Sequence, residues 1–104
     1  MDEVIDRMRA ISERLKKEYN AEKVILFGSY ARGEATADSD VDILVIAPTA
    51  ERFFERMATV LRLTRDLHYK LPLEPIVLTK EEVDQRLQRG DQFVRQIIEK
   101  GVYL

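Results

Sequence analysis

VILFGSYARG, at residues 24–33, and SDVDILV, at residues 39–45, decide the fold of this chain. Each stretch contains a short apolar run that is bounded by glycine, serine or aspartate, and such runs are typical of buried strands. We therefore predict strands over 24–27 and 41–47. The segment between them predicts a short helical turn at Tyr30–Gly33, followed by a polar loop that leads into the second strand.

Outside these strands, apolar residues recur every three to four positions, which predicts amphipathic helices. Thr49, Thr79 and Asp91 each precede such a pattern and are expected to cap a helix, and Glu82 would make Thr79 part of a capping box. The predicted elements are, in chain order, a helix over 3–19, the strands over 24–27 and 41–47, a helix from Thr49 to about Tyr69, a strand over 73–78, a helix from Thr79 to Gly90, a helix from Asp91 to Gly101 and a small strand over 102–104.

This order of elements predicts an α/β (α+β) fold, in which helices pack on a small mixed β-sheet. At 104 residues the chain is expected to form a single domain over 1–104. Three aromatic side chains lie on apolar helix faces and are expected in the core, namely Phe53, Phe54 and Phe93. For the Phe53–Phe54 pair, the alternative is that one ring is left for a partner.

Composition limits the classes of function. The 17 basic and 19 acidic residues nearly balance, which argues against direct nucleic-acid binding, because domains that bind a phosphate backbone carry a basic surplus. The absence of cysteine excludes thiolate metal sites, and the lone His68 excludes a multi-histidine site. No apolar run is long enough to span a bilayer, and Met1–Glu3 shows no signal-peptide pattern, so we expect no membrane role and a cytoplasmic location.

Gly28 and Ser29 directly follow the first predicted strand. Glycine lets a backbone approach a ligand closely, and the free N–H groups of a helical turn that starts at Ser29 would point at an incoming anion. The serine hydroxyl adds a further donor. These features suit the outer phosphates of a nucleotide, although a strand-to-helix turn with a capping serine is the simpler alternative.

Asp40 and Asp42 lie one residue apart at the start of the second predicted strand. Side chains alternate between the two faces of a strand, so these carboxylates are expected on the same face. Two such carboxylates can share a hard divalent cation such as Mg2+, which binds oxygen and bridges to substrate phosphates. A solvated turn is the alternative, but Asp42 lies inside an apolar run, where an unpaired carboxylate is costly.

The order Gly28-Ser29, ten residues, Asp40-x-Asp42 resembles the signature of the nucleotidyltransferase superfamily that includes DNA polymerase beta. The form G-S-Y-A-R-G and the short length are most similar to its minimal nucleotidyltransferase (MNT) branch. The resemblance implies a polymerase beta-like fold with the active site at one edge of a small mixed sheet. It also implies transfer of a nucleotide from a nucleoside triphosphate, with ATP as substrate and one or two Mg2+ ions as cofactor.

The family has a third carboxylate on a neighbouring strand, and Glu74 is the candidate in this chain. This chain departs from the family in that Glu replaces the usual Asp and Pro75 follows it. By the resemblance, Asp40, Asp42 and Glu74 form the catalytic and metal-binding set, in which Glu74 completes the metal site or takes the acceptor proton. An edge-strand glutamate beside a proline, with no catalytic role, is the alternative.

The resemblance also assigns nucleotide binding to Gly28, Ser29, Arg32, Gly33 and Ser39. Arg32 lies three residues after Ser29, so on a helical turn it could hold a phosphate with two hydrogen bonds. A surface position is the alternative for Arg32. Gly33 would let the chain turn, and Ser39 directly precedes the two aspartates.

The MNT proteins that this chain resembles are encoded beside small helical HEPN proteins, in pairs similar to toxin–antitoxin modules. The resemblance implies an antitoxin that transfers AMP to a tyrosine hydroxyl of a HEPN-type toxin, in a hetero-oligomer. The chain ends after the core domain, so we expect the partner to supply the acceptor-binding surface. Two alternatives remain, a non-catalytic module that neutralises its partner by binding, and a split catalytic subunit that acts on a small molecule or RNA.

Overall fold

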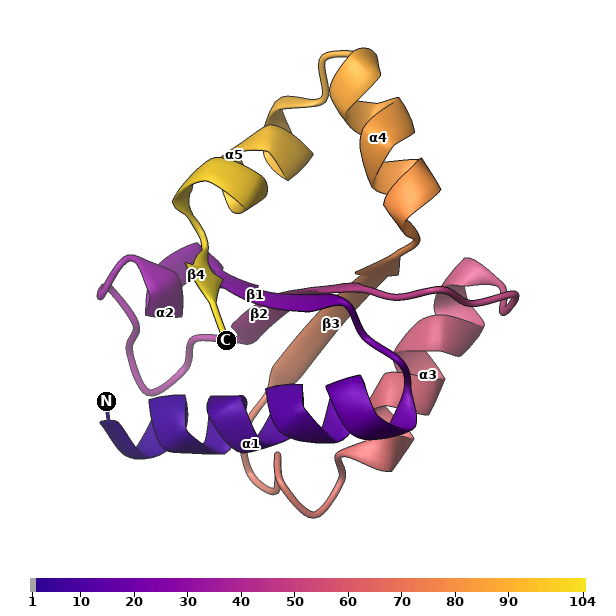
Figure 1. The fold of residues 1–104 in the computed structure, drawn as a ribbon. Coiled ribbons are helices and arrows are strands. Elements are labelled where there is room, and N and C mark those ends of the chain that lie inside the picture. Colours follow the sequence, from indigo (N-terminus) through magenta and orange to yellow (C-terminus); the bar gives the residue numbers. More distant parts are fainter. Residues whose placement is uncertain (1) are drawn as a thin grey trace.

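The computed structural model describes residues 2–104, and its centre is a four-stranded mixed sheet with strand order β3-β2-β1-β4 (Figure 1). β1 pairs antiparallel with both β2 and β4, whereas β2 and β3 are parallel. This confirms the predicted mixed sheet with packed helices. The elements are α1 (Asp2–Glu18), β1 (Lys23–Phe27), α2 (Gly28–Ala31), β2 (Val41–Ile46), α3 (Phe53–Leu63), β3 (Leu73–Leu78), α4 (Lys80–Gln88), α5 (Gln92–Lys100) and β4 (Val102–Tyr103).

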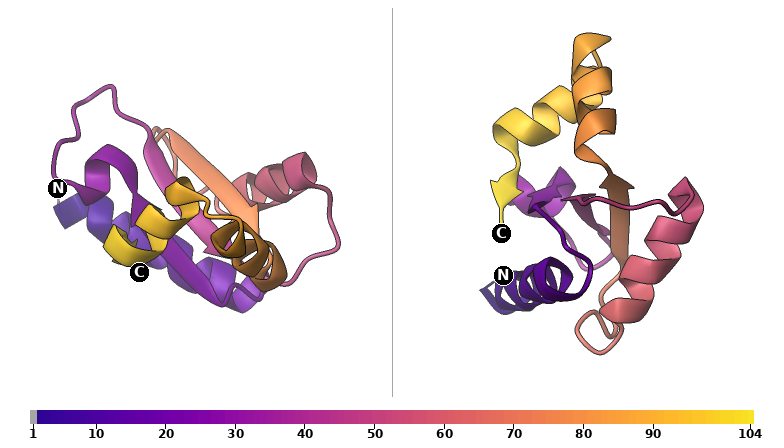
Figure 2. Two further views of the ribbon diagram at one scale, coloured as in Figure 1. Left: turned by 90° about the horizontal axis from the view of Figure 1, so that it is seen from above. Right: turned by 45° about the vertical axis from the view of Figure 1, so that its right-hand side comes forward.

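Helices cover both faces of the sheet, with α1 and α3 on one side and α4 and α5 on the other (Figure 1 and Figure 2). Alternation along β2 divides its side chains between two cores. Val41 and Ile43 pack with the first core, which includes residues of α1 and α3, whereas Leu44 packs with the core under α4 and α5. Within residues 2–104, none of the helices has the length and apolar character needed to cross a membrane.

The helix predicted from Thr49 to about Tyr69 is shorter at both ends. Thr49 does not cap it, because the Thr49 hydroxyl accepts a hydrogen bond from the Glu51 N–H (3.1 Å) in the preceding turn. The N-cap is Arg52, whose N–H donates to the Glu55 carboxylate (2.9 Å). At the other end the helix stops at Leu63.

Two arginines of α1 account for the early end of α3. Arg14 donates to the Leu63 carbonyl (3.1 Å), one of the last carbonyls of the helix, which have no partner within it. Arg7 donates to the carbonyls of Leu67 (3.0 Å) and Tyr69 (2.6 Å) in the following turns. The Arg14 side chain from a distant helix therefore satisfies the Leu63 carbonyl, which in a longer α3 would have accepted from the N–H four residues later.

The caps of the last two helices are confirmed. The Thr79 hydroxyl accepts from the Glu82 N–H (3.2 Å), and the Glu82 carboxylate accepts from the Thr79 N–H (2.8 Å), which completes the capping box. The Asp91 carboxylate accepts from the N–H of Val94 (3.1 Å), and Gly101 ends α5.

The prediction that three phenylalanines lie in the core is wrong. Phe53 and Phe54 are 39% and 78% exposed and pack edge to face against each other. Phe93 is 52% exposed and packs edge to face against Phe27 at the end of β1, with ring centroids 5.6 Å apart. Helical spacing identifies the apolar face of a helix, but it does not tell how much of that face the rest of the fold covers, and these rings are left exposed.

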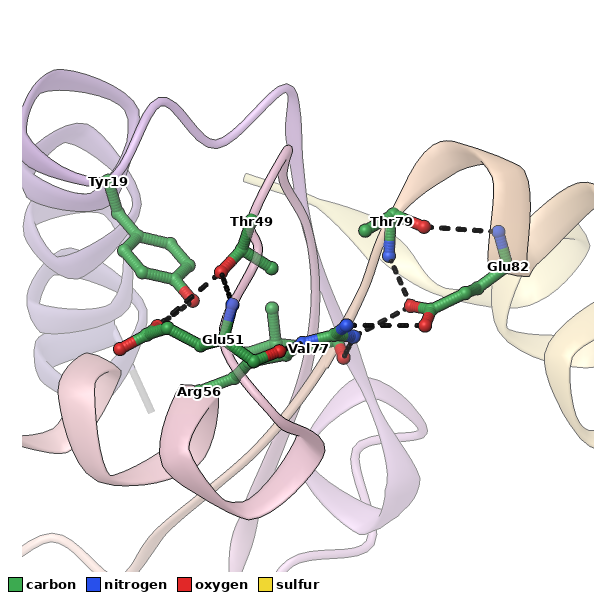
Figure 3. Close-up of polar contacts among 7 residues, drawn as sticks. All are labelled: Tyr19, Thr49, Glu51, Arg56, Val77, Thr79 and Glu82. Atoms are coloured by element: carbon green, nitrogen blue, oxygen red, sulfur yellow. Dashed lines mark hydrogen bonds and ion pairs between the residues drawn. The ribbon is translucent and has the colours of Figure 1, made fainter.

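A buried arginine joins α3, β3 and α4 (Figure 3). The Arg56 guanidinium donates to both carboxylate oxygens of Glu82 (2.6 and 3.2 Å), to the Val77 carbonyl (3.1 Å) and to the Glu51 carbonyl (2.9 Å). The hydrogen bond from Arg56 is the main cause that holds the pKa of the Glu82 carboxyl below its usual range. This pair therefore stabilises the fold above the unfolded-state pKa of glutamate, and the contribution is lost as the pH falls through the lowered pKa.

Glu82→Ala is expected to lower the free energy of unfolding by about 1–3 kcal/mol, because it leaves the buried Arg56 guanidinium without its anion and removes the carboxylate that accepts from the Thr79 N–H in the capping box. Chemical denaturation at pH 7 would measure this loss. The matched control is Glu81→Ala, an exposed glutamate in the same helical turn, whose effect should stay within about 0.5 kcal/mol. Equal effects of the two substitutions would contradict a structural role for the Arg56–Glu82 pair.

Candidate active site at the edge of the sheet

Strand register brings the motif residues together at one edge of the sheet. Phe27, the last residue of β1, pairs with Asp42 of β2, and Asp42 pairs in turn with Glu74 of β3. Cross-strand partners share a face of the sheet, so the Asp42 and Glu74 side chains are neighbours on the side covered by α4 and α5. Asp40 is exposed and immediately precedes β2, and it lies close enough to Asp42 for the two carboxylates to interact.

Gly28 makes room for the Asp42 carboxylate. Its φ of +76° lies in the left-handed region that favours glycine, and a Cβ added there would collide with Asp42 Oδ2. The turn after β1 and the carboxylate of β2 are therefore packed against each other without an intervening side chain. This close approach supplies a structural reason for a glycine in the Gly28-Ser29 motif.

The charges around Asp42 favour a bound cation. Burial raises the pKa of the Asp42 carboxyl, and the nearby Asp40 and Glu74 carboxylates raise it further, whereas the Arg32 guanidinium lowers it. The Asp40 and Glu74 carboxylates are therefore close enough to Asp42 that each of them makes its ionisation more costly. A hard divalent cation would relieve this repulsion, and oxygen donors are the ligands that Mg2+ prefers.

The carboxylate oxygens of Asp40 and Asp42 fit such a cation and would be its ligands. Within residues 2–104, no three histidine or acidic side chains come together closely enough to hold a metal ion between them. Glu74 lies next to Asp42 in register but does not complete such a group. Its role as third ligand therefore stays a prediction.

The other predicted nucleotide-binding residues have different surroundings. Arg32 lies at the end of α2 and forms an ion pair with Glu34, and Gly33 has a φ of +72° in the turn that follows. The Ser29 carbonyl accepts from the Glu34 N–H (2.9 Å). The Ser39 hydroxyl accepts from the N–H of Thr36 (2.9 Å), so it holds the loop ahead of β2.

A pocket of about 430 Å³ opens beside Asp42, and α5 forms its opposite wall. Pockets of this volume are typical of small-molecule sites. The motif residues Gly28, Arg32 and Asp42 line this pocket. Three others, Ser29, Ser39 and Asp40, do not. Sequence reasoning missed the wall that α5 contributes, and the only signal in the sequence is the helical spacing of its residues, which are Phe93, Gln96, Ile97 and Lys100.

Comparisons with known proteins agree with this geometry. The profile of the nucleotidyltransferase domain family matches residues 8–104. Two Methanocaldococcus jannaschii proteins, provisionally named protein adenylyltransferases, are each 34% identical to the chain, over 80% and 84% of its length and 81% and 83% of theirs. Protein adenylyltransferase MntA of Thermococcus cleftensis is 42% identical over 43% of the chain and 46% of its own length. The crystal structure of a Sulfolobus solfataricus protein, provisionally named a nucleotidyltransferase, matches with a TM-score of 0.51 and 26% identity, over 82% of this chain and 80% of that one.

Proposed function

This chain belongs to the nucleotidyltransferase domain family, and on that premise we propose that it transfers AMP from ATP to a hydroxyl group of a partner protein. The observation that carries the proposal is the position of Asp42, which lies against Gly28 at a pocket and has Asp40 and Glu74 as neighbours. The names of relatives that are similar over most of their length support a protein as the acceptor.

The reaction is a displacement at phosphorus. The acceptor oxygen forms a bond to the α-phosphorus of ATP, the bond from that phosphorus to the bridging oxygen breaks, and pyrophosphate leaves with the bonding electrons. The acceptor gives up its hydroxyl proton. Such reactions depend mainly on positioning and on neutralisation of charge, so the protein contributes chiefly by holding the reactants.

Each motif residue has a part in this proposal. Asp40 and Asp42 would hold Mg2+, which supplies charge neutralisation for the triphosphate and the leaving pyrophosphate. The Gly28–Ser29 turn would place its N–H groups toward the phosphates, and Arg32 would contact them from the end of α2. Glu74, adjacent to Asp42, would accept the proton from the acceptor hydroxyl or complete the metal site.

We propose a HEPN-type toxin as the partner and a tyrosine as the acceptor, which makes this chain the antitoxin of a cytoplasmic pair. The motif G-S-Y-A-R-G supports this assignment through its resemblance to the MNT branch. The exposed Phe53 and Phe54 rings are apolar surface that a partner could cover.

Intact-mass spectrometry of the co-purified partner tests the proposal. With ATP and Mg2+, the partner is expected to gain one or more AMP units, and the gain should disappear with EDTA. GTP, CTP and UTP in parallel reactions would establish the base preference. Small alcohols and tRNA serve as alternative acceptors, and modification of these in place of the partner would overturn a protein acceptor.

One observation favours a second candidate, a binding module that neutralises its partner without chemistry. Among the described residues, the three acidic side chains of the motif do not form a ready-made metal group. A partner that is bound and inhibited but never gains mass, at any divalent cation concentration, would support this candidate.

A further inference from the structure

Four residues of α5 form a stripe that faces the pocket beside Asp42. Phe93, Gln96, Ile97 and Lys100 occupy positions i, i+3, i+4 and i+7, which lie on one side of an α-helix, and all four line the pocket. Ile97 is 3% exposed and forms the base of the stripe. The other three side chains are at least partly exposed, so they are available to a ligand.

The C-terminal end of α5 lies next to the glycine turn. β4 pairs antiparallel with β1 through Leu26 and Val102, so the residues that directly precede β4, Lys100 and Gly101, lie toward the end of β1 that leads into Gly28. A Cβ at Gly101 would collide with Ile25, so the approach of the two segments is close. Lys100 therefore stands at the same end of the pocket as the Gly28–Ser29 turn.

Phe93 stands at the other end of the stripe. Lys100 lies seven positions later in the chain, which corresponds to about 10 Å along the helix axis. Its ring packs edge to face against Phe27, with an interplanar angle of 88°, so its orientation is held from within the protein. An exposed and oriented aromatic ring is a suitable surface for a planar base.

The charges of the pocket single out Lys100. Arg32, the other cation that lines the pocket, is paired with Glu34, whereas Lys100 takes part in none of the ion pairs formed within residues 2–104. An unpaired ammonium group beside a phosphate-sized turn is suited to a phosphate chain.

We propose that α5 is the second wall of the nucleotide site, where Lys100 binds the outer phosphates and Phe93 packs against the base, an assignment that rests on the proposed function. The site then consists of two halves from distant parts of the sequence. The motif of β1, α2 and β2 holds the metal and the reacting phosphate, and α5 holds the two ends of the nucleotide. Both residues would be binding residues.

Isothermal titration calorimetry with a non-hydrolysable ATP analogue and with AMP, both in Mg2+, tests this assignment. Lys100→Ala is expected to weaken the binding of the ATP analogue roughly 10-fold or more and to change the affinity for AMP by less than about 2-fold, because only the outer phosphates lose a partner. Lys100→Arg should restore most of the affinity for the analogue. Phe93→Ala should weaken the binding of both ligands by about 5-fold or more, because both contain the base.

Lys17→Ala is the matched control, because Lys17 is an exposed lysine on α1, across the sheet from the pocket. The Lys17→Ala protein should bind both ligands with the affinity of the wild type. Equal affinity of Lys100→Ala and wild type for the analogue would overturn the assignment while leaving the proposed function in place. Tight nucleotide binding without AMP transfer by the wild type would overturn the proposed function alone. A wild type that binds neither ligand would overturn both.

Discussion

Asp42→Asn is expected to lower the rate of AMP transfer on the order of a thousandfold or more, which corresponds to about 4 kcal/mol of transition-state stabilisation. Asn keeps the shape of the side chain but loses the negative charge that would hold Mg2+. Asp42 is the carboxylate next to the Gly28 turn and the acidic residue among those that line the pocket, so the substitution removes negative charge at the pocket itself.

The same substitution should make the metal-free protein more stable at neutral pH. The pKa of Asp42 is raised in the folded state by burial and by Asp40 and Glu74, so ionisation of this group opposes folding. Stability is therefore lost as the pH rises from the unfolded-state pKa through the raised pKa. Asn cannot ionise, so the Asp42→Asn protein does not lose stability in this way. The difference in stability between the two proteins should therefore become smaller in acid.

Thermal melts in EDTA between pH 4 and pH 8, repeated with Mg2+, would measure both effects. Mg2+ is expected to raise the Tm of the wild type and to leave that of Asp42→Asn nearly unchanged. Asp38→Asn is the control, because Asp38 is an exposed acidic residue of the same loop and should neither reduce transfer nor change the response to Mg2+. If Asp42→Asn transferred AMP at the wild-type rate, the assignment of the metal site would be wrong.

The part of the site that local sequence predicts well is the part built from strands. The apolar runs before Gly28 and after Asp40 predict the two central strands, and a third apolar run predicts the strand over 73–78 that carries Glu74. The expectation that this third strand lies next to Asp42 comes from the family resemblance, and the pairing of β3 with β2 agrees with it. Alternation within a strand then fixes which face carries Asp42. These inferences succeed because strand length, bounding residues and alternation are local properties.

Tertiary contacts determine what the local pattern misses. The end of α3 at Leu63 depends on Arg14, which lies 49 residues earlier in the chain. The exposure of Phe93 depends on the pairing of β4 with β1, which sets α5 over the end of the sheet. No periodicity within α5 distinguishes a face that lines a pocket from a face that lies on a core.

Gly28→Ala is expected to lower the free energy of unfolding by about 2–4 kcal/mol and to reduce AMP transfer by roughly a hundredfold or more. Two causes act together. Alanine is strained at a φ of +76°, and its Cβ would occupy the position of Asp42 Oδ2, so the carboxylate must move away from the place where it would hold the metal.

Gly90→Ala separates these causes. Gly90 has a φ of +81°, and a Cβ there would meet nothing within 4 Å, so this control introduces the backbone strain without a collision. It should cost about 1–2 kcal/mol of stability and leave transfer unchanged. Chemical denaturation and the transfer assay, applied to both variants, would measure the excess effect at Gly28. Equal losses of stability at the two glycines would contradict a steric role for Asp42.

A double-mutant cycle locates the collision in one atom pair. Asp42→Ala removes Oδ2 and Cγ and leaves only the Cβ of residue 42, which lies 3.5 Å from the position that a Cβ at Gly28 would occupy, an ordinary contact distance. In that background, Gly28→Ala should cost no more stability than Gly90→Ala does. The difference between the two backgrounds is then the coupling free energy between Gly28 and the carboxylate. A large coupling would mean that the glycine of the Gly-Ser motif is required because it sets the position of the metal-binding aspartate, in addition to any contact it makes with phosphate.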